Sequence, residues 1–115
     1  MAFNKREEPS AYQRALALLV RREHSRKELG RKLKAKGVER EDADFALDKL
    51  NKQDFQNDAR FAETLARSRV SAGYGPIRIR AELGTHGLSR EDMDAAMAII
   101  DTDWLQTARE LVARK

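Results

Sequence analysis

The sequence predicts an all-α protein built from tandem three-helix repeats that form an elongated, curved array. Three observations support this prediction: the balance of helix and strand formers, the helical spacing of apolar residues, and an internal repeat. Valine, isoleucine and threonine together number only twelve among 115 residues, whereas Ala, Leu, Arg, Lys and Glu dominate. Because the dominant residues are strong helix formers, the composition favours helix over sheet.

Composition also excludes several kinds of site. The chain has no cysteine, so disulfides and thiolate metal sites are excluded, and two separated histidines do not supply a usual metal-ligand set. No apolar run is long enough to span a membrane, and the first ten residues lack the apolar core of a signal peptide. We therefore expect a cytoplasmic protein without a metal or other cofactor.

The internal repeat aligns residues 33–50 with residues 83–100 without gaps. Seven of the eighteen aligned positions are identical, Gly37/Gly87 among them. Apolar residues recur at i, i+3, i+4 and i+7 in both copies, which places them on one face of a helix. They are Ala43, Ala46, Leu47 and Leu50 in the first copy and Met93, Ala96, Met97 and Ile100 in the second.

Helix start and stop signals define the first copy. A capping box at Ser10 predicts a helix over residues 10–23. A second capping box at Ser25 begins a short helix, which ends where Gly37 suits the C′ position. The third helix follows Glu39, which is a weaker N-cap.

The second copy is expected to contain the same three helices. Its leading helix spans about residues 57–72, with Phe61 in the pattern of a core residue. Pro76 suits the first position of the middle helix, where its missing N–H costs nothing. Gly87 then suits the C′ position, and Ser89 begins the last helix.

These signals divide the chain into four segments. Residues 1–9 form a flexible N-terminal segment, residues 10–52 the first three-helix repeat and residues 53–101 the second. The leading-helix pattern returns after residue 101, so residues 102–115 are expected to form the first helix of an incomplete third repeat. A helical repeat buries its apolar face only by stacking on a neighbour.

Charge is segregated along the chain, although the net charge is only +4. The segment from position 21 to 36 contains eight basic and two acidic residues. The segment from position 67 to 80 contains four arginines and no acidic residue. Acidic residues gather around positions 39–48 and 91–103. This alternation fits either one basic and one acidic surface or a solubilising surface of mixed sign.

The central part of the chain resembles the signature of the RecX regulatory family. The matching pattern combines a D-x-x-F-A start, an R-x-R helix end and a G-x-G-P-x-R-I transition at fixed distances. Positions in the first copy, from Ala15 to Gly37, are also similar to the first repeat of that family. The segments of the central signature are Asp58-Ala-Arg-Phe-Ala-Glu63, Ala66-Arg-Ser-Arg69, Gly73-Tyr-Gly-Pro-Ile-Arg-Ile-Arg-Ala-Glu-Leu83 and Gly87-Leu88.

The resemblance implies a small, non-enzymatic modulator of the RecA recombinase. Such a protein would bind the RecA nucleoprotein filament on single-stranded DNA and inhibit the ATPase, strand-exchange and coprotease activities of RecA. Neither a small-molecule substrate nor a membrane is implied. The third repeat of the family has three helices, whereas this chain has room for one.

Two groups of basic residues are candidates for binding the partner or DNA phosphates. Four arginines flank the loop from Gly73 to Pro76, and arginine suits forked contacts with carboxylates or phosphates. The alternative is that they pair with Glu63 and Glu82. On the first repeat, three basic residues recur at i, i+4 and i+7, and a further arginine precedes them. The alternative to a binding role is that this basic face is only solvated. The candidates are Arg67, Arg69, Arg78, Arg80, Arg22, Lys27, Arg31 and Lys34.

The glycine loop and the absence of catalytic motifs bear on the alternative functions. Tyr74 in the glycine loop could stack on single-stranded bases, but packing at the repeat junction is the favoured role. The loop is too short for a phosphate cradle, so we interpret its glycines as turn residues. The alternative function is a general single-stranded nucleic-acid binding module. An enzyme is disfavoured because no nucleophile, acid–base pair or metal motif is visible.

Overall fold

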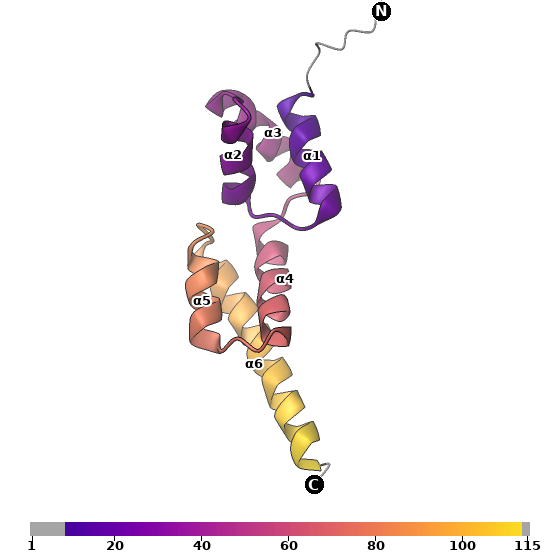
Figure 1. Cartoon of the computed structure of the whole chain (residues 1–115), viewed down its shortest axis with the longest axis vertical. Helices are drawn as coiled ribbons and strands as arrows, with labels where there is room; N and C mark the ends of the chain where they lie inside the picture. Colours follow the sequence, from indigo (N-terminus) through magenta and orange to yellow (C-terminus); the bar gives the residue numbers. More distant parts are fainter. Residues whose placement is uncertain (1–8, 114–115) are drawn as a thin grey trace, which may run out of the picture. The chain divides into compact units, whose positions relative to one another are not determined.

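The computed structural model describes residues 9–113, with side chains as far as residue 101 and at positions 105, 109 and 110. The regular structure of this part is helical throughout, which confirms the predicted all-α fold (Figure 1). Of the segment 1–9, expected to be flexible, residues 1–8 lie outside the described part. The helices are α1 (Ala11–Arg21), α2 (Arg26–Ala35), α3 (Arg40–Lys52), α4 (Asp58–Ser71), α5 (Pro76–Gly84) and α6 (Arg90–Ala113).

The helices form two compact three-helix units, which confirms the tandem repeat. Helices α1, α2 and α3 make the first unit, and α4, α5 and α6 make the second. The division falls between Asn57 and Asp58, at the start of α4. Figure 1 shows the two groups of three helices. Each unit has its own core.

The positions that repeat in the sequence are the positions that fill the two cores. Leu33, Ala46 and Leu50 are at most 3% exposed, and so are their counterparts Leu83, Ala96 and Ile100. Phe61 is buried as predicted, whereas Met93 and Met97 are only half-buried against the second core. The core of the first unit contains Ala15, Leu29, Leu33, Ala43, Leu47 and Leu50, and the core of the second contains Phe61, Ala62, Ala66, Ile79, Leu83, Leu88, Ala96 and Ile100.

The predicted helix starts are confirmed by their hydrogen bonds. Ser10 and Gln13 form a reciprocal capping box at α1. The Ser25 hydroxyl accepts from the Glu28 N–H at 3.0 Å, and the Ser89 hydroxyl accepts from the Asp92 N–H at 3.0 Å. Glu39 makes no side-chain capping bond, as expected of a weaker N-cap.

Glycines reverse the chain after α2 and α4 through Schellman motifs. At Gly37 (φ 85°) the N–H of Val38 donates to the Leu33 carbonyl at 3.1 Å, and at Gly73 (φ 90°) the N–H of Tyr74 donates to the Arg69 carbonyl at 2.9 Å. The glycine loop is therefore a helix-ending turn, as predicted, rather than a phosphate cradle. It also brings Tyr74 back beside Arg69.

Helix α6 crosses the expected boundary at residue 102 without a break. It runs from Arg90 to Ala113, and no glycine or proline lies within it to stop the helix. The sequence had suggested that a separate helix would begin there. The assignment of residues 102–115 to a third repeat stays a prediction.

Substituting Gly37 tests the left-handed turn. A Cβ at Gly37 or at Gly84 would meet no heavy atom within 4 Å, but only Gly37 has a positive φ. We expect Gly37→Ala to lower the free energy of unfolding by about 1 kcal/mol, because L-residues are strained in this conformation. Gly84→Ala, the matched control at a helix end, should leave stability unchanged or raise it by about 0.5 kcal/mol. Urea denaturation followed by circular dichroism measures both, and equal effects would contradict the assignment.

Candidate partner-binding surfaces

Three of the four predicted arginines in the second unit are held by carboxylates. Arg67 pairs with Glu63 within α4 at 3.2 Å, and Arg80 of α5 pairs with Asp94 of α6 at 2.7 Å. Both pairs are about half exposed. The structure therefore bears out part of the alternative that these side chains pair with neighbouring acids, and it extends that alternative to Asp94.

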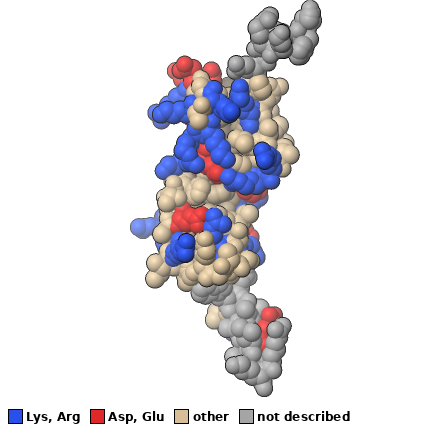
Figure 2. Space-filling model, in the orientation of Figure 1, with Lys and Arg blue, Asp and Glu red and all other residues tan. Residues whose placement is uncertain are grey.

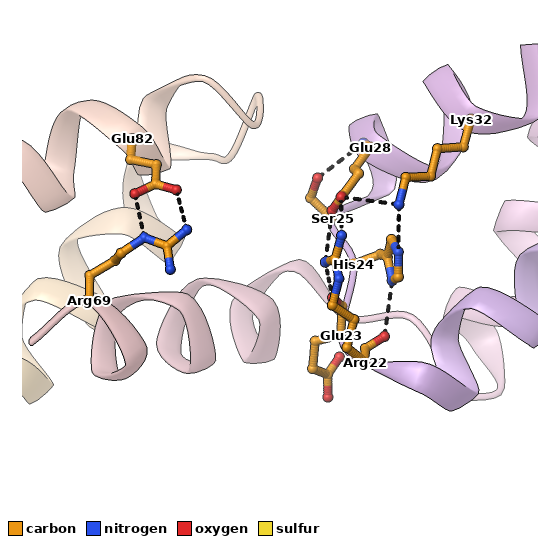
Figure 3. Close-up of polar contacts among 8 residues, drawn as sticks. All are labelled: Arg22, Glu23, His24, Ser25, Glu28, Lys32, Arg69 and Glu82. Atoms are coloured by element: carbon orange, nitrogen blue, oxygen red, sulfur yellow. Dashed lines mark hydrogen bonds and ion pairs between the residues drawn. The ribbon is translucent and has the colours of Figure 1, made fainter. Parts of the chain in front are cut away.

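Arg69 makes the most ordered of these contacts. Its Nε and Nη2 atoms donate to the two carboxylate oxygens of Glu82, each at 2.7 Å, which is a bidentate pair between α4 and α5 (Figure 3). These hydrogen bonds lower the pKa of Glu82 and raise the pKa of Arg69. Both side chains are about 30% exposed. The fork joins α4 to α5, and its donors are therefore engaged within the unit.

Arg78 is the one predicted arginine of this unit without a carboxylate oxygen within 4 Å among the described residues. Its guanidinium lies 4.0 Å from the centre of the Tyr74 ring, and that of Arg69 lies 5.8 Å from it. Tyr74 is half-buried and packs against the core of the second unit. Packing, the favoured role for Tyr74, agrees with this geometry, and stacking on bases stays a prediction. The exposed Arg78 keeps its donors available.

The first unit carries a different kind of surface. Lys27, Arg31 and Lys34 lie exposed on one face of α2, and no ion pair or hydrogen bond joins their side chains to any described residue. They line a groove of about 660 Å³ beside the start of α3, where Glu39 and Asp44 also contribute. Blue side chains cover much of this unit in Figure 2. We call Lys27, Arg31 and Lys34 the α2 stripe.

Arg22, the remaining predicted residue, is not available for a partner because it is paired with the buried Glu28. Its guanidinium forms a bidentate contact with Glu28, whose side chain is 8% exposed. Lys32 lies 3.5 Å from the same carboxylate. Burial by itself would raise the pKa of Glu28, but hydrogen bonds from Arg22 and the nearby positive charges outweigh it and lower that pKa to about 2 (Figure 3).

His24 is the residue of this cluster that sequence reasoning missed. Its position in the sequence gives no sign of burial, but it is 2% exposed. Its Nδ1 lies 3.0 Å from the Arg22 carbonyl and its Nε2 lies 3.1 Å from the Lys32 amine (Figure 3). Since the amine can only donate, these contacts require a neutral ring with its proton on Nδ1. Burial lowers the pKa of His24, and the charges of Arg22 and Lys32 lower it further.

The cluster of Arg22, His24, Glu28 and Lys32 is connected to the end of α3 by hydrogen bonds. The buried Gln56 side chain donates to the His24 carbonyl at 3.3 Å, and Asn51 donates to the Gln56 carbonyl at 3.2 Å. Nothing in the local sequence marks this contact, because His24 and Gln56 are 32 positions apart. The one local signal was the capping pair of Ser25 and Glu28.

These surfaces are suited to binding anionic groups. In the described part of the chain, no group of three or more His, Asp or Glu side chains is placed to hold a metal ion. None of the described helices is long and apolar enough to cross a membrane. What the geometry offers is the α2 stripe on one unit and Arg78 on the other, with donors for phosphates or carboxylates.

Comparison with known proteins gives matches to both three-helix units. The family model for the first three-helix domain of RecX matches residues 11–50, and that for the second three-helix domain of RecX matches residues 57–97. Each match covers one unit of the structure. Together they account for α1, α2, α4 and α5, for α3 as far as residue 50 and for the first part of α6.

Two curated proteins illustrate the similarity. Regulatory protein RecX of Xanthomonas oryzae pv. oryzae (strain MAFF 311018) is 56% identical over 108 residues, which is 94% of this chain and 68% of that protein. Regulatory protein RecX of Stenotrophomonas maltophilia (strain R551-3) is 58% identical over 108 residues, or 94% of this chain and 66% of that protein. The chain thus spans about two thirds of the length of these relatives.

A solved structure agrees with the fold. A crystal structure of regulatory protein RecX superimposes with a TM-score of 0.72 at 27% identity. The match covers 78% of this chain and 45% of that one. The superimposed part therefore makes up less than half of the chain in that crystal structure.

The Glu28 cluster predicts a dependence of stability on pH. The folded-state pKa of Glu28 is about 2 against 4.5 for the ordinary group, so its stabilisation is present above pH 4.5 and is lost as the pH falls towards 2. At pH 7 we expect Glu28→Gln to lower the free energy of unfolding by about 3 kcal/mol. The difference from the parent should narrow below pH 4.5.

His24 adds to this dependence in the same direction. Because its pKa is lowered from 6.5 in the folded state, the unfolded chain takes up a proton first, and stability declines as the pH falls below 6.5. Urea denaturation at several pH values between 7 and 3 tests both groups. Glu63→Gln, which alters an exposed pair, is the control and should change stability by less than about 0.5 kcal/mol throughout. A Glu28→Gln effect that is equal at every pH would contradict the assignment.

The Arg69 fork predicts unequal effects of removing arginines from the second unit. Arg69→Ala should lower the free energy of unfolding by about 1.5 kcal/mol, because it leaves a partly buried carboxylate without its two donors. Arg80→Ala removes an exposed pair and should cost less than about 1 kcal/mol. Both variants are compared by urea denaturation. An equal or reversed order would show that the fork does not join α4 to α5 as described.

Proposed function

The chain belongs to the RecX family of regulatory proteins, and on that premise we propose that it binds the RecA filament on single-stranded DNA. Binding inhibits the ATPase, strand-exchange and coprotease activities of RecA. The observation that carries the proposal is the match of both three-helix units to the two RecX domains in the same order along the chain. Regulation works by binding and involves no catalysis by this chain.

The α2 stripe is the first surface through which the chain makes this contact. Its three cations are exposed and have no described partner, so binding an anion breaks no existing ion pair. A filament on DNA offers both phosphates and carboxylates to such a surface. The spacing of Lys27 and Lys34 places their side chains on one face of α2, about two turns apart.

Arg78 is the corresponding contact on the second unit. Its neighbours Arg69 and Arg80 are engaged by Glu82 and Asp94, so their role is to shape the surface. With exposed cations on both units, one chain can engage two neighbouring RecA protomers. Holding those protomers in fixed positions opposes the coupled movements that ATP turnover needs, and this accounts for inhibition without catalysis.

The test is the single-stranded-DNA-dependent ATPase of RecA, with the chain titrated in at fixed DNA and again at a large excess of DNA. Filament recognition predicts inhibition at chain concentrations too low to cover the DNA, and the inhibition persists at the excess. No inhibition at any ratio would count against the proposal.

A matched pair of variants assigns the surface. Lys27→Ala with Lys34→Ala removes two charges from the α2 stripe, and Lys49→Ala with Lys52→Ala removes two from α3. We expect the first pair to raise the half-inhibitory concentration roughly tenfold, at about 0.7 kcal/mol for each contact, and the second to change it less than about twofold. If the two pairs of variants had equal effects, the assignment of the contact to α2 would be wrong.

A general single-stranded nucleic-acid binding module is the second candidate, favoured by the unpaired cations of the α2 stripe. In that case the chain would coat bare oligothymidylate with a steep dependence on salt. Excess DNA would then remove its effect on RecA. The ATPase titration at excess DNA therefore separates the two functions.

A further inference from the structure

A second groove in the first unit lies between α1 and α2 and is lined by no residue of α3. Its volume is about 830 Å³, within the range of well-formed binding pockets. The residues beneath it are apolar: Ala17 and Leu18 from α1 and Leu33 and Ala35 from α2. Ala17 and Ala35 are exposed, and their short side chains leave room for larger apolar side chains of a partner.

The edges of this groove are cationic on both sides. Arg14 and Arg21 line it from α1, Lys32 of α2 and its C-cap residue Lys36 line it from the other side, and none of the lining residues is acidic. Arg21 and Lys36 are exposed and have no described side-chain partner.

At its His24 end the groove meets a recess of about 380 Å³. Leu18, Arg21 and Lys32 line both hollows, and Arg22 and His24 complete the smaller one. No acidic residue lines this recess either. Basic side chains therefore line both edges of an apolar strip, and at the recess end Arg22 and Lys32 are paired with Glu28 whereas Arg21 has no described partner.

We propose that this groove binds an acidic amphipathic helical segment of a protein partner. Apolar side chains at i, i+3, i+4 and i+7 of that segment rest on Ala17, Leu18 and Ala35. Carboxylates on its flanks face Arg21 and Lys36. This inference does not rest on RecA being the partner.

The lining residues favour a peptide over a nucleic acid. No aromatic side chain lines the groove, so it has no platform for base stacking. Its apolar strip would also be buried against polar sugar and phosphate groups, which gains little. The α2 stripe, by contrast, lies on the opposite side of α2, since Lys32 and Lys36 are each about half a turn around the helix from Lys34.

The test uses a fluorescein-labelled synthetic helical peptide with leucines at i, i+3, i+4 and i+7 and glutamates on the flanks. A scrambled peptide of the same composition is the peptide control. Fluorescence anisotropy measures binding to the parent chain and to two double variants of equal charge change. Arg21→Glu with Lys36→Glu reverses the groove edges, and Lys27→Glu with Lys34→Glu reverses the α2 stripe.

The groove variant should weaken binding of the amphipathic peptide at least about tenfold, and the stripe variant no more than about threefold. The scrambled peptide should bind at least about tenfold more weakly than the amphipathic one. Ala17→Phe, which fills the groove without a charge change, should also abolish binding. Unchanged thermal unfolding by circular dichroism shows that the variants remain folded.

Five outcomes would overturn the proposal. Failure of the amphipathic peptide to bind is the first, and equal binding of both peptides, which would reduce the groove to a nonspecific charged surface, is the second. Equal losses in the two double variants would place the peptide elsewhere. Displacement of the peptide by equimolar oligothymidylate would assign the groove to nucleic acid, and sedimentation showing a dimer that Arg21→Glu with Lys36→Glu dissolves would assign it to a second copy of this chain.

Discussion

The structure depends on how three short helices bury a common apolar face. Helices of nine to fourteen residues, as α1 to α5 are, are marginal alone, because the cost of nucleating a helix exceeds what so few backbone hydrogen bonds return. Each unit therefore relies on a core of only a few large side chains, such as Leu29, Leu33 and Leu50 in the first. Tight turns follow from this small size, and Schellman motifs at Gly37 and Gly73 provide two of them.

Polar contacts between helices add to these small apolar cores. Arg69 joins α4 to α5 through Glu82, Arg80 joins α5 to α6 through Asp94, and Arg22 satisfies the buried Glu28. A cation engaged in this way shapes the surface more than it recognises a partner. The side chains that remain for recognition are those facing away from every such contact, above all the α2 stripe and Arg78. Stability and recognition thus draw on the same residue types but on different faces of the helices.

Local sequence was sufficient for the fold class and most of the helix boundaries. The Ser10 and Ser25 caps, Pro76 at the start of α5 and the repeated apolar spacing all act within a few residues, so a pattern in the chain records them directly. The fifty-residue repeat predicted two equivalent cores, because equivalent positions fold into equivalent units. The same logic placed a boundary at residue 102, where α6 continues because no residue there stops a helix.

The sequence by itself determined an all-α pair of repeated units and the family to which they belong. Only the tertiary structure decided which cations are engaged, because Arg69 and Glu82 are 13 positions apart and meet only when α4 packs on α5. It likewise decided that His24 is buried against Lys32 and Gln56. The physical reason is the range of the forces. Caps and periodicity act along the chain, whereas ion pairs and burial act across space and exist only once the helices have packed.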